Sequence, residues 1–298
     1  MATRNIGIGI ALGGGGSRAL THLGVLCAIA EAGLKVEAVA GSSLGAIIGA
    51  MYVFQPDAAA VRERARAYFQ KSPPFGRHPR PAKGNGLENA AGWWRRLRKY
   101  LWTAAIANII AARRSLLRHN PAFQAIDDLI PDRDIAEAEM PFACNALDLT
   151  RGALTTFTSG PVRRALKAST AVGVVFPPYE WDSAVYVDAA PVSSVPVRTC
   201  RSLGARFVIA VDVRTPAPAT LTIDNGYDVI SRIESVESRA LNDAEIASAD
   251  IVLRPKVDDV FWGDFTRCAE AVEAGAQAAR AALSDICRRA IFSPATLS

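Results

Sequence analysis

The chain has 298 residues, of which half are apolar and about a fifth are charged, with 34 Lys and Arg against 29 Asp and Glu. This composition is that of a globular protein with one large α/β domain or two small ones, and it excludes intrinsic disorder and collagen-like repetition. The longest apolar run, 101–112, is shorter than the ~20 residues that span a bilayer, and no signal peptide is expected. Five separated cysteines without a CxxC pair predict reduced thiols in a cytoplasmic chain, not a disulfide framework or a zinc site.

Strands and helices alternate in the first 54 residues. Apolar residues alternate over 6–12 and predict a strand, which ends in a run of four glycines. Residues 17–32 carry apolar side chains at helical spacing and close on Gly33, a typical C-cap. A short buried strand is predicted at 36–40 and an apolar helix at 46–54. This alternation predicts an α/β fold with a mostly parallel central sheet and helices on both faces.

Residues 70–120 interrupt the alternation. They contain several prolines and glycines and then a helical stretch rich in Trp and Arg, and we interpret them as a basic insertion or lid within a single domain spanning 1–298. The insertion has eleven Lys or Arg and one acidic residue, a net charge of +10, whereas the remainder of the chain carries −5. The α/β pattern then resumes, with predicted strands at 142–147, 154–157, 184–187, 207–213 and 251–253 and predicted helices at 162–169 and 265–290.

A serine between two glycines stands between the strand at 36–40 and the helix at 46–54. The spacing of Gly41, Ser43 and Gly45 is that of a nucleophile elbow, where glycines let the chain turn tightly and hold the serine hydroxyl clear of the backbone. The same residues suit an ordinary turn that needs small side chains. The strand–turn–helix context favours Ser43 as a nucleophile.

A serine nucleophile needs a base, and the histidines do not fit the usual order. In α/β-hydrolases the histidine follows the serine and the acid near the C-terminus, but the histidines here are His22, His78 and His119, and none follows residue 119. His22 lies among apolar residues of the first predicted helix and is expected in the core. We therefore expect a carboxylate to activate the serine directly as general base.

Asp188 is the best-placed carboxylate. It follows the predicted strand at 184–187 and precedes Ala189 and Ala190, whose side chains are too small to block a neighbouring group. Taken alone, this local sequence equally suits an aspartate that forms a turn and caps the next segment.

The glycine run allows three interpretations. As a dinucleotide-binding loop, Gly14-x-Gly16-x-x-Ala19 fits a permissive fingerprint, but the acidic residue expected after the second strand is missing. As a plain turn, four glycines would be entropically costly. As an oxyanion hole, the amides of Gly14, Gly15 and Gly16 at a helix N-terminus can approach a developing alkoxide closely, with the charge of Arg18 beside them.

These motifs, in this order, resemble those of the patatin-like phospholipase family over most of the chain outside 70–120. Besides the glycine run and the serine elbow, the matching blocks are Ala168-Ser169-Thr170 to Phe176-Pro177-Pro178, Asp188-Ala189-Ala190 with Val195-Pro196-Val197, Val208 to Val213, and Asp250-Ile251-Val252. Ala19 and Ala189 depart from the family pattern, since glycine is usual at both places. Each adds one methyl group near the expected site.

The resemblance implies a three-layer α/β/α hydrolase that cleaves acyl esters of phospholipids or other lipids. Ser43 and Asp188 would form a catalytic dyad working through an acyl-enzyme, Gly14 to Gly16 with Arg18 would stabilise the oxyanion, and no metal or other cofactor would be needed. The alternatives are a catalytically weak or inactive protein of the same fold that binds lipid or membrane, and a scaffold that presents the basic insertion to a partner.

The basic insertion predicts a partner. Residues 93–102 mix Trp and Tyr with Arg and Lys, and a short apolar stretch follows, as in an interfacial helix that binds an anionic membrane surface. A solvated amphipathic helix packed on the core is the plain alternative. Nucleic acid is not the expected partner, because no nucleic-acid-binding fold accompanies the charges. We expect a cytoplasmic protein with peripheral attachment to a membrane, and the sequence leaves its oligomeric state open.

Overall fold

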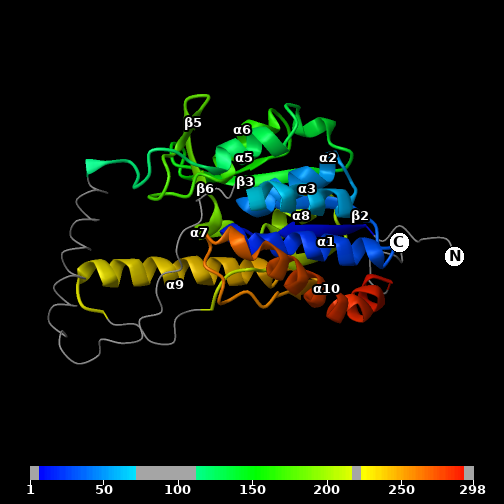
Figure 1. The fold of residues 1–298 in the computed structure, drawn as a ribbon. Helices are drawn as coiled ribbons and strands as arrows, with labels where there is room; N and C mark the ends of the chain where they lie inside the picture. The colour runs from blue at the N-terminus through cyan, green and yellow to red at the C-terminus, as the bar shows by residue number, and fades with distance from the viewer. Residues whose placement is uncertain (1–6, 72–111, 217–222, 292–298) are drawn as a thin grey trace.

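The computed structural model describes residues 7–71, 112–216 and 223–291, and it is built around one central sheet (Figure 1). The eight strands of the described chain are β1 (Ile8–Leu12), β2 (Val36–Gly41), β3 (Phe142–Asp148), β4 (Ala153–Phe157), β5 (Tyr179–Trp181), β6 (Ala184–Asp188), β7 (Phe207–Val211) and β8 (Ile251–Leu253). Their order is β5-β6-β3-β2-β1-β7-β8, with β4 paired to β3. The pairs β3–β2, β2–β1, β1–β7 and β7–β8 are parallel, so the expected mostly parallel sheet is confirmed.

Helices cover both faces of the sheet, which confirms the three-layer α/β/α architecture. They are α1 (Thr21–Glu31), α2 (Leu44–Phe54), α3 (Ala58–Lys71), α5 (Ala122–Leu129), α6 (Val162–Ser169), α7 (Ala190–Ser193), α8 (Val197–Ser202), α9 (Gly226–Ile246) and α10 (Cys268–Ile291), with short 3-10 turns at Gly16–Leu20 (η1), Ile135–Glu137 (η2) and Phe265–Arg267 (η3). None of the helices in these described ranges could cross a membrane.

The two faces of the sheet are packed differently. Because successive side chains of a strand point to opposite faces, Ile8, Ile10 and Leu12 of β1 join a large core with α1, α2, α3, α6 and α10. Ala11 of β1 faces the other way, into a smaller core built mostly from alanine and valine with α8 and the end of α9. The small side chains let α8 lie close to the strands. The core with α1, α2, α3, α6 and α10 therefore contains most of the large buried side chains, whereas the core with α8 contains mainly small ones.

The way β2 and β6 pair with β3 brings two distant segments together. Cys144 of β3 pairs with Gly41 on one edge and with β4 on the other, and Ala146 pairs with Asp188 and again with β4. Because β4 lies along one edge of β3 from Cys144 to Asp148, the ends of β2 and β6 share the opposite edge, two residues apart along β3. β2 is parallel and β6 antiparallel to β3, so the two strands end facing each other.

Most elements match the sequence expectations. The predicted strands at 184–187 and 207–213 and the helix at 46–54 are present with bounds shifted by one or two residues, and the predicted helix at 162–169 has the same bounds as α6. The helix predicted at 17–32 begins as the 3-10 turn η1. The long helix α9 is not among the elements predicted from the sequence, and many of its apolar side chains are exposed. Of the predicted basic insertion 70–120, residues 72–111 lie outside the described residues.

Candidate active site

Ser43 occupies the turn between β2 and α2 in a backbone conformation that side-chain-bearing residues rarely adopt. Its φ is 53° and its ψ is −129°, and it stands at the N-cap of α2 with 9% of its surface exposed. Such a conformation costs roughly 1–3 kcal/mol and persists only when the surroundings enforce it. The serine that the sequence pattern predicts to be a nucleophile therefore carries backbone strain.

The glycines on either side of Ser43 are required by close backbone contacts. A Cβ on Gly45 would collide with the Leu12 carbonyl oxygen at the end of β1, and one on Gly41 would lie 2.7 Å from the Ala46 nitrogen. These contacts explain why the turn carries glycine at both positions two residues from Ser43. The first turn of α2 thus packs directly against the ends of the central strands.

Ser169, the last residue of α6, supports the elbow from outside it. The backbone N–H of Ser43 donates a hydrogen bond to Ser169 Oγ at 3.1 Å, and Ser169 is completely buried. This bond satisfies a buried donor that the strained turn leaves without a backbone acceptor. The sequence placed Ser169 in a block resembling a known family but gave it no role.

Asp188 lies at the end of β6, beside Ser43, with 5% of its surface exposed. Its Oδ1 accepts a hydrogen bond from the Ala190 N–H at 2.8 Å, and its own N–H donates to the Ala171 carbonyl at 2.9 Å. Burial raises the pKa of Asp188 to about 6, while hydrogen bonding from the Ser43 hydroxyl and the Ala190 N–H acts in the opposite direction. A carboxyl with this pKa is ionised at neutral pH and is basic enough to accept a proton.

The structure also tests the alternative interpretation of Asp188 as a residue that forms a turn and caps the next segment. The Ala190 N–H bond is the short-range contact of a turn-forming aspartate, so that interpretation is correct as far as it goes. The same carboxylate nevertheless adjoins Ser43, because the ends of β2 and β6 meet on β3. The turn orients the carboxylate, and the sheet pairing determines which residue it meets.

The glycine loop between β1 and η1 lies against Ser43. A Cβ on Gly14 would be 3.1 Å from Ser43 Cβ, which shows how closely the loop approaches. The Gly14 N–H donates to the Ser194 carbonyl at 2.9 Å, whereas the N–H groups of Gly15 and Gly16 have no partner among the described residues. Of the three amides expected in an oxyanion hole, the latter two therefore have hydrogen-bonding capacity to spare.

Arg18 stabilises the glycine loop through a hydrogen bond. Its Nε donates to the Gly15 carbonyl at 3.2 Å, and burial lowers its pKa while the nearby charge of Asp258 raises it. The guanidinium holds the loop from within as well as contributing positive charge. It lines the same cavity as Ser43.

His22 is a structural residue in this region. It is completely buried, its Nε2 lies 2.7 Å from the Gly13 carbonyl oxygen, and burial lowers its pKa to about 4. The ring is therefore neutral at pH 7 and donates from Nε2. The position of His22 agrees with its expected place in the core.

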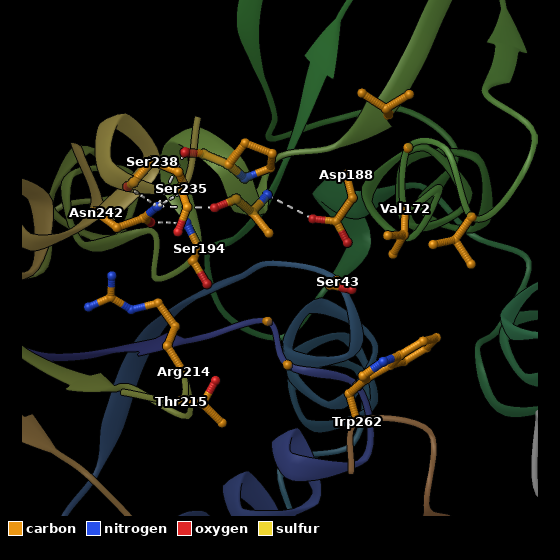
Figure 2. A pocket seen from close by; sticks show the side chains of 18 of the residues that line it. Ser43, Val172, Asp188, Ser194, Arg214, Thr215, Ser235, Ser238, Asn242 and Trp262 are labelled. Atoms are coloured by element: carbon orange, nitrogen blue, oxygen red, sulfur yellow. Dashed lines mark hydrogen bonds between the residues drawn. The ribbon is translucent and has the colours of Figure 1, made fainter. Parts of the chain in front are cut away.

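Ser43 and Asp188 open into a cavity of about 720 Å³ with two unlike sides (Figure 2). Val172 and Trp262 lie on one side of Ser43 and Asp188. The opposite side is polar and is formed by these residues: Ser194, Arg214, Thr215, Ser235, Ser238 and Asn242. Arg239, which also lines the cavity, belongs to this polar side, because its Nη2 donates to the Thr215 carbonyl. Ser43 and Asp188 thus lie between an apolar wall and a polar one.

A narrow apolar recess of about 70 Å³ leads from Ser43 into the core. It is lined largely by Leu44, Ile47, Phe69, Ala122, Ala125, Phe176, Trp262 and Phe265. Side chains of this kind suit a hydrocarbon chain and offer almost no hydrogen bonds. The sequence carries no local signal for this recess, because its residues come from six separate parts of the chain.

The polar wall also went unrecognised in the sequence. Most of it lies on α9, whose start carries a helix signal: the Asn225 side chain caps the helix by accepting the Asp228 N–H at 3.0 Å. Asn242, near the end of α9, accepts the Ser194 N–H at 2.6 Å and donates to the Ala190 carbonyl at 3.1 Å. Through Asn242, α9 is fixed to the segment that follows Asp188.

The fold and the site together define a three-layer α/β protein in which a strained serine elbow, a buried aspartate and a glycine loop meet at the ends of the strands. The family model described as "Patatin-like phospholipase" matches residues 10–201, almost two thirds of the chain. The chain belongs to the patatin-like phospholipase family, which confirms the resemblance inferred from its motifs.

Several curated proteins are similar to this chain. Patatin-like phospholipase domain-containing protein ZK370.4 of Caenorhabditis elegans is 26% identical over 94% of this chain, Lysophospholipase NTE1 of Debaryomyces hansenii 23% over 91%, and human patatin-like phospholipase domain-containing protein 6 27% over 69%. The matched regions are 21%, 17% and 13% of those relatives. The chain therefore spans about a fifth or less of the length of these relatives.

Solved structures are more distant. VipD from Legionella pneumophila has 14% sequence identity and a TM-score of 0.48, with 93% of this chain and 66% of that chain covered. The type III effector protein ExoU has 14% identity and a TM-score of 0.34, with 92% and 53% covered.

Proposed function

We propose that the protein is a serine acyl hydrolase that cleaves carboxylic esters of lipids, with Ser43 as nucleophile and Asp188 as general base. The observation that carries the proposal is the meeting of these two residues: a strained, glycine-flanked serine beside a buried carboxyl whose pKa burial raises to about 6. Family membership and the names of the relatives support a lipid substrate.

In the proposed reaction, Ser43 Oγ attacks the ester carbonyl carbon while its proton passes to the Asp188 carboxylate. The negative charge that develops on the carbonyl oxygen is stabilised by the N–H groups of Gly15 and Gly16, with Arg18 adding positive charge. When the tetrahedral intermediate collapses, Asp188 gives its proton to the leaving alcohol, and the acyl group remains on Ser43 Oγ.

Water then releases the acyl group. Asp188 takes a proton from the water as it attacks the acyl-enzyme, and returns that proton to Ser43 Oγ as the carboxylic acid leaves. The acyl chain would lie along the apolar wall of the cavity and in the recess beyond Ser43. No step of this scheme requires a metal or another cofactor.

A fluorophosphonate probe tests the proposal directly, because it reacts with activated serines. We expect labelling at Ser43, located by peptide mass spectrometry, and loss of both labelling and ester turnover in Ser43→Ala. Ser42→Ala is the matched control, since the Ser42 hydroxyl is buried and has no hydrogen-bond partner in the described part of the chain. Undiminished turnover of a nitrophenyl ester by Ser43→Ala would reject the enzyme and favour the non-catalytic lipid-binding alternative.

A further inference from the structure

We propose that Arg239 of α9 binds an anion at the polar side of the active-site cavity. The anion is the phosphodiester of a glycerophospholipid whose acyl ester lies at Ser43. This inference rests on the proposed function, because it assigns the headgroup end of the same site. It starts from the contrast between the two cavity walls, which places an apolar surface and a charged surface on opposite sides of the reactive pair. A lipid with one acyl chain and one charged headgroup likewise has an apolar part and a charged part on opposite sides of its ester bond.

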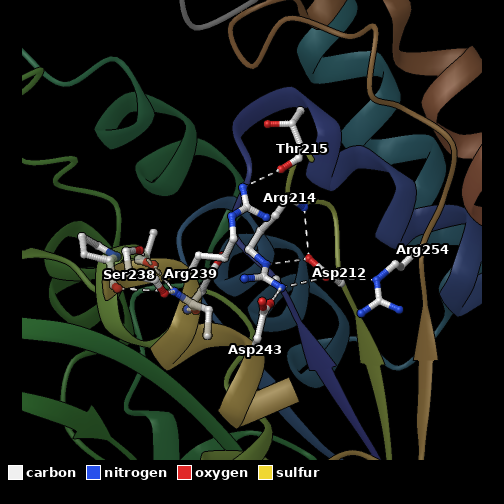
Figure 3. Close-up of polar contacts among 12 residues, drawn as sticks. Asp212, Arg214, Thr215, Ser238, Arg239, Asp243 and Arg254 are labelled. Atoms are coloured by element: carbon white, nitrogen blue, oxygen red, sulfur yellow. Dashed lines mark hydrogen bonds and ion pairs between the residues drawn. The ribbon is translucent and has the colours of Figure 1, made fainter. Parts of the chain in front are cut away.

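The charges of the polar wall do not balance. The wall meets the end of β7 at a cluster of arginines and aspartates, which are Arg214, Arg239, Arg254, Asp212 and Asp243 (Figure 3). Arg214 donates to Asp212 at 2.9 Å and to Asp243 at 2.9 Å, and Arg254 lies 3.4 Å from Asp212. The two carboxylates are therefore engaged by Arg214 and Arg254, and one guanidinium remains.

The remaining guanidinium is that of Arg239. It lines the cavity, and the described residues offer it no carboxylate within ion-pair distance; its one hydrogen bond among them goes from Nη2 to the Thr215 carbonyl at a long 3.4 Å. A guanidinium has five N–H donors in a fixed planar arrangement that matches two oxygens of a phosphate or carboxylate. Arg239 thus has donors to spare for an anionic ligand.

Arg18, the third arginine that lines the cavity beside Arg214 and Arg239, is committed elsewhere. Arg18 donates from Nε to the Gly15 carbonyl at 3.2 Å and lies near the charge of Asp258. It belongs to the glycine loop on the reactive side. An anionic headgroup and a developing oxyanion would therefore be met by different guanidinium groups.

The helix that carries Arg239 is held at a fixed place relative to Ser43 and Asp188. Asn242, three residues further along α9 and 2% exposed, accepts the Ser194 N–H at 2.6 Å and donates to the Ala190 carbonyl at 3.1 Å. Ala190 in turn donates to Asp188. Because these bonds connect α9 to the base, a headgroup bound at Arg239 would orient the ester toward Ser43 instead of merely raising affinity for the surface.

The test compares two substrates that differ in the phosphodiester. One is a lysophosphatidylcholine and the other is a monoacylglycerol with the same acyl chain, each assayed as monomers. In Arg239→Gln, kcat/KM for the lysophospholipid should fall about ten- to a hundredfold, while kcat/KM for the monoacylglycerol stays within about twofold. Arg239→Lys, which keeps the charge but loses the planar donor pair, should retain part of the selectivity.

Arg232→Gln is the matched control. Arg232 lies on the same helix, is also half-buried, and is not among the residues that line the cavity. It should leave the ratio of the two kcat/KM values unchanged. An equal fall for both substrates in Arg239→Gln, or no fall for either, would overturn the proposal.

Two further measurements separate the sources of the anion and the two proposals. Glycerophosphocholine should inhibit the wild type competitively and lose that effect in Arg239→Gln; inhibition by inorganic phosphate as strong as that by glycerophosphocholine would reject a lipid headgroup as the ligand. Calorimetric binding of an ether-linked lysophospholipid, which has no ester to cleave, should weaken about tenfold or more in Arg239→Gln. This binding does not depend on turnover, so an inactive wild type that still binds the ether lipid through Arg239 would reject the proposed function alone.

Discussion

The two sides of the active-site cavity are built in different ways. On the side formed by the strand ends, Ser43 and Asp188 are almost completely buried, the backbone at Ser43 is strained, and glycines make contacts that no larger residue could make. On the side formed by α9, Ser235 is exposed, and Arg239 is half-buried with one hydrogen bond of 3.4 Å among the described residues.

Under the proposed function, this difference separates reactivity from recognition. Gly41, Gly45 and Ser169 cannot change without moving the backbone or leaving a buried group unsatisfied, so a change there should reduce the rate for every substrate. A residue on the cavity side of α9 can change with little cost to the fold, so a change there should alter which substrate is preferred. The following experiments test this contrast.

The largest effect on the strand-end side, short of removing Ser43, is expected from Asp188→Asn. The amide keeps the size of the carboxylate and can still accept the Ala190 N–H, but it cannot take the serine proton. We expect turnover of all ester substrates to fall by ~10²- to 10⁴-fold, as is typical when a general base is lost. Activity that survives in Asp188→Asn and disappears in a His22 variant would show that the dyad is assigned wrongly.

The pH dependence of the wild type should report the same carboxyl. Because the base must be ionised and the pKa of Asp188 is about 6, kcat/KM should rise with pH through 6 and level off above 7, with about a tenth of the plateau left at pH 5. A profile of kcat/KM from pH 4.5 to 8.5 with a soluble ester checks this. A midpoint near pH 4, the ordinary value for a carboxyl, would show that burial does not tune the base.

The contribution of Asp188 to the free energy of unfolding should fall with rising pH, whereas its contribution to kcat/KM rises. A carboxyl whose pKa is raised by folding contributes stability below its unfolded pKa, near 3.8, and that contribution is lost as the pH rises through about 6. Asp188→Asn should therefore be more stable than the wild type at pH 8, by up to about 3 kcal/mol, and equally stable at pH 4. Urea denaturation at the two pH values measures the difference.

A smaller loss is expected when the support of the elbow is removed. Ser169→Ala leaves the buried Ser43 N–H without its acceptor, so the strained turn should relax and kcat should fall about tenfold with little change in KM. Ser169→Thr keeps the hydroxyl and should restore most of kcat. If KM rises instead and the threonine variant does not recover, Ser169 acts on the fold and not on the position of Ser43.

Charge reversal in the basic insertion is expected to have the smallest effect on turnover. It should leave the intrinsic rate unchanged and reduce only membrane binding. Each Lys or Arg near an anionic bilayer contributes about 1 kcal/mol, screened over ~8 Å at physiological salt. Liposome co-sedimentation of Arg95→Glu/Arg96→Glu/Arg98→Glu should therefore fall steeply on anionic vesicles at low salt, while Trp93, Trp94 and Trp102 maintain a residual salt-insensitive affinity.

A second triple variant controls for net charge. Arg66→Glu/Arg288→Glu/Arg289→Glu reverses three exposed charges elsewhere and should bind vesicles like the parent. Equal sedimentation of the parent and the Arg95, Arg96 and Arg98 variant would reject docking by this segment. Preferential capture of the parent by oligonucleotides over anionic lipid would favour nucleic acid as its partner.

Local patterns in the sequence were enough to predict the elements whose cause is local. Alternating apolar residues predicted β1, helical spacing predicted α1, and the two glycines around Ser43 predicted the elbow, because each pattern reflects backbone geometry within a few residues. The order of motifs along the chain was enough to infer the family. The roles of Ser43 and Asp188 were predicted in the same way and await the experiments above.

Which groups meet and which remain free depends on contacts between distant segments of the fold. β3 brings the ends of β2 and β6 together, and no local pattern encodes that shared edge. The Ser194 carbonyl occupies the Gly14 N–H, while Asp212 and Asp243 engage Arg214 and leave Arg239 without a described carboxylate partner. Hydrogen bonds and ion pairs of this kind join segments far apart in the chain, so the capacity left over for a ligand is a property of the fold and not of any one segment.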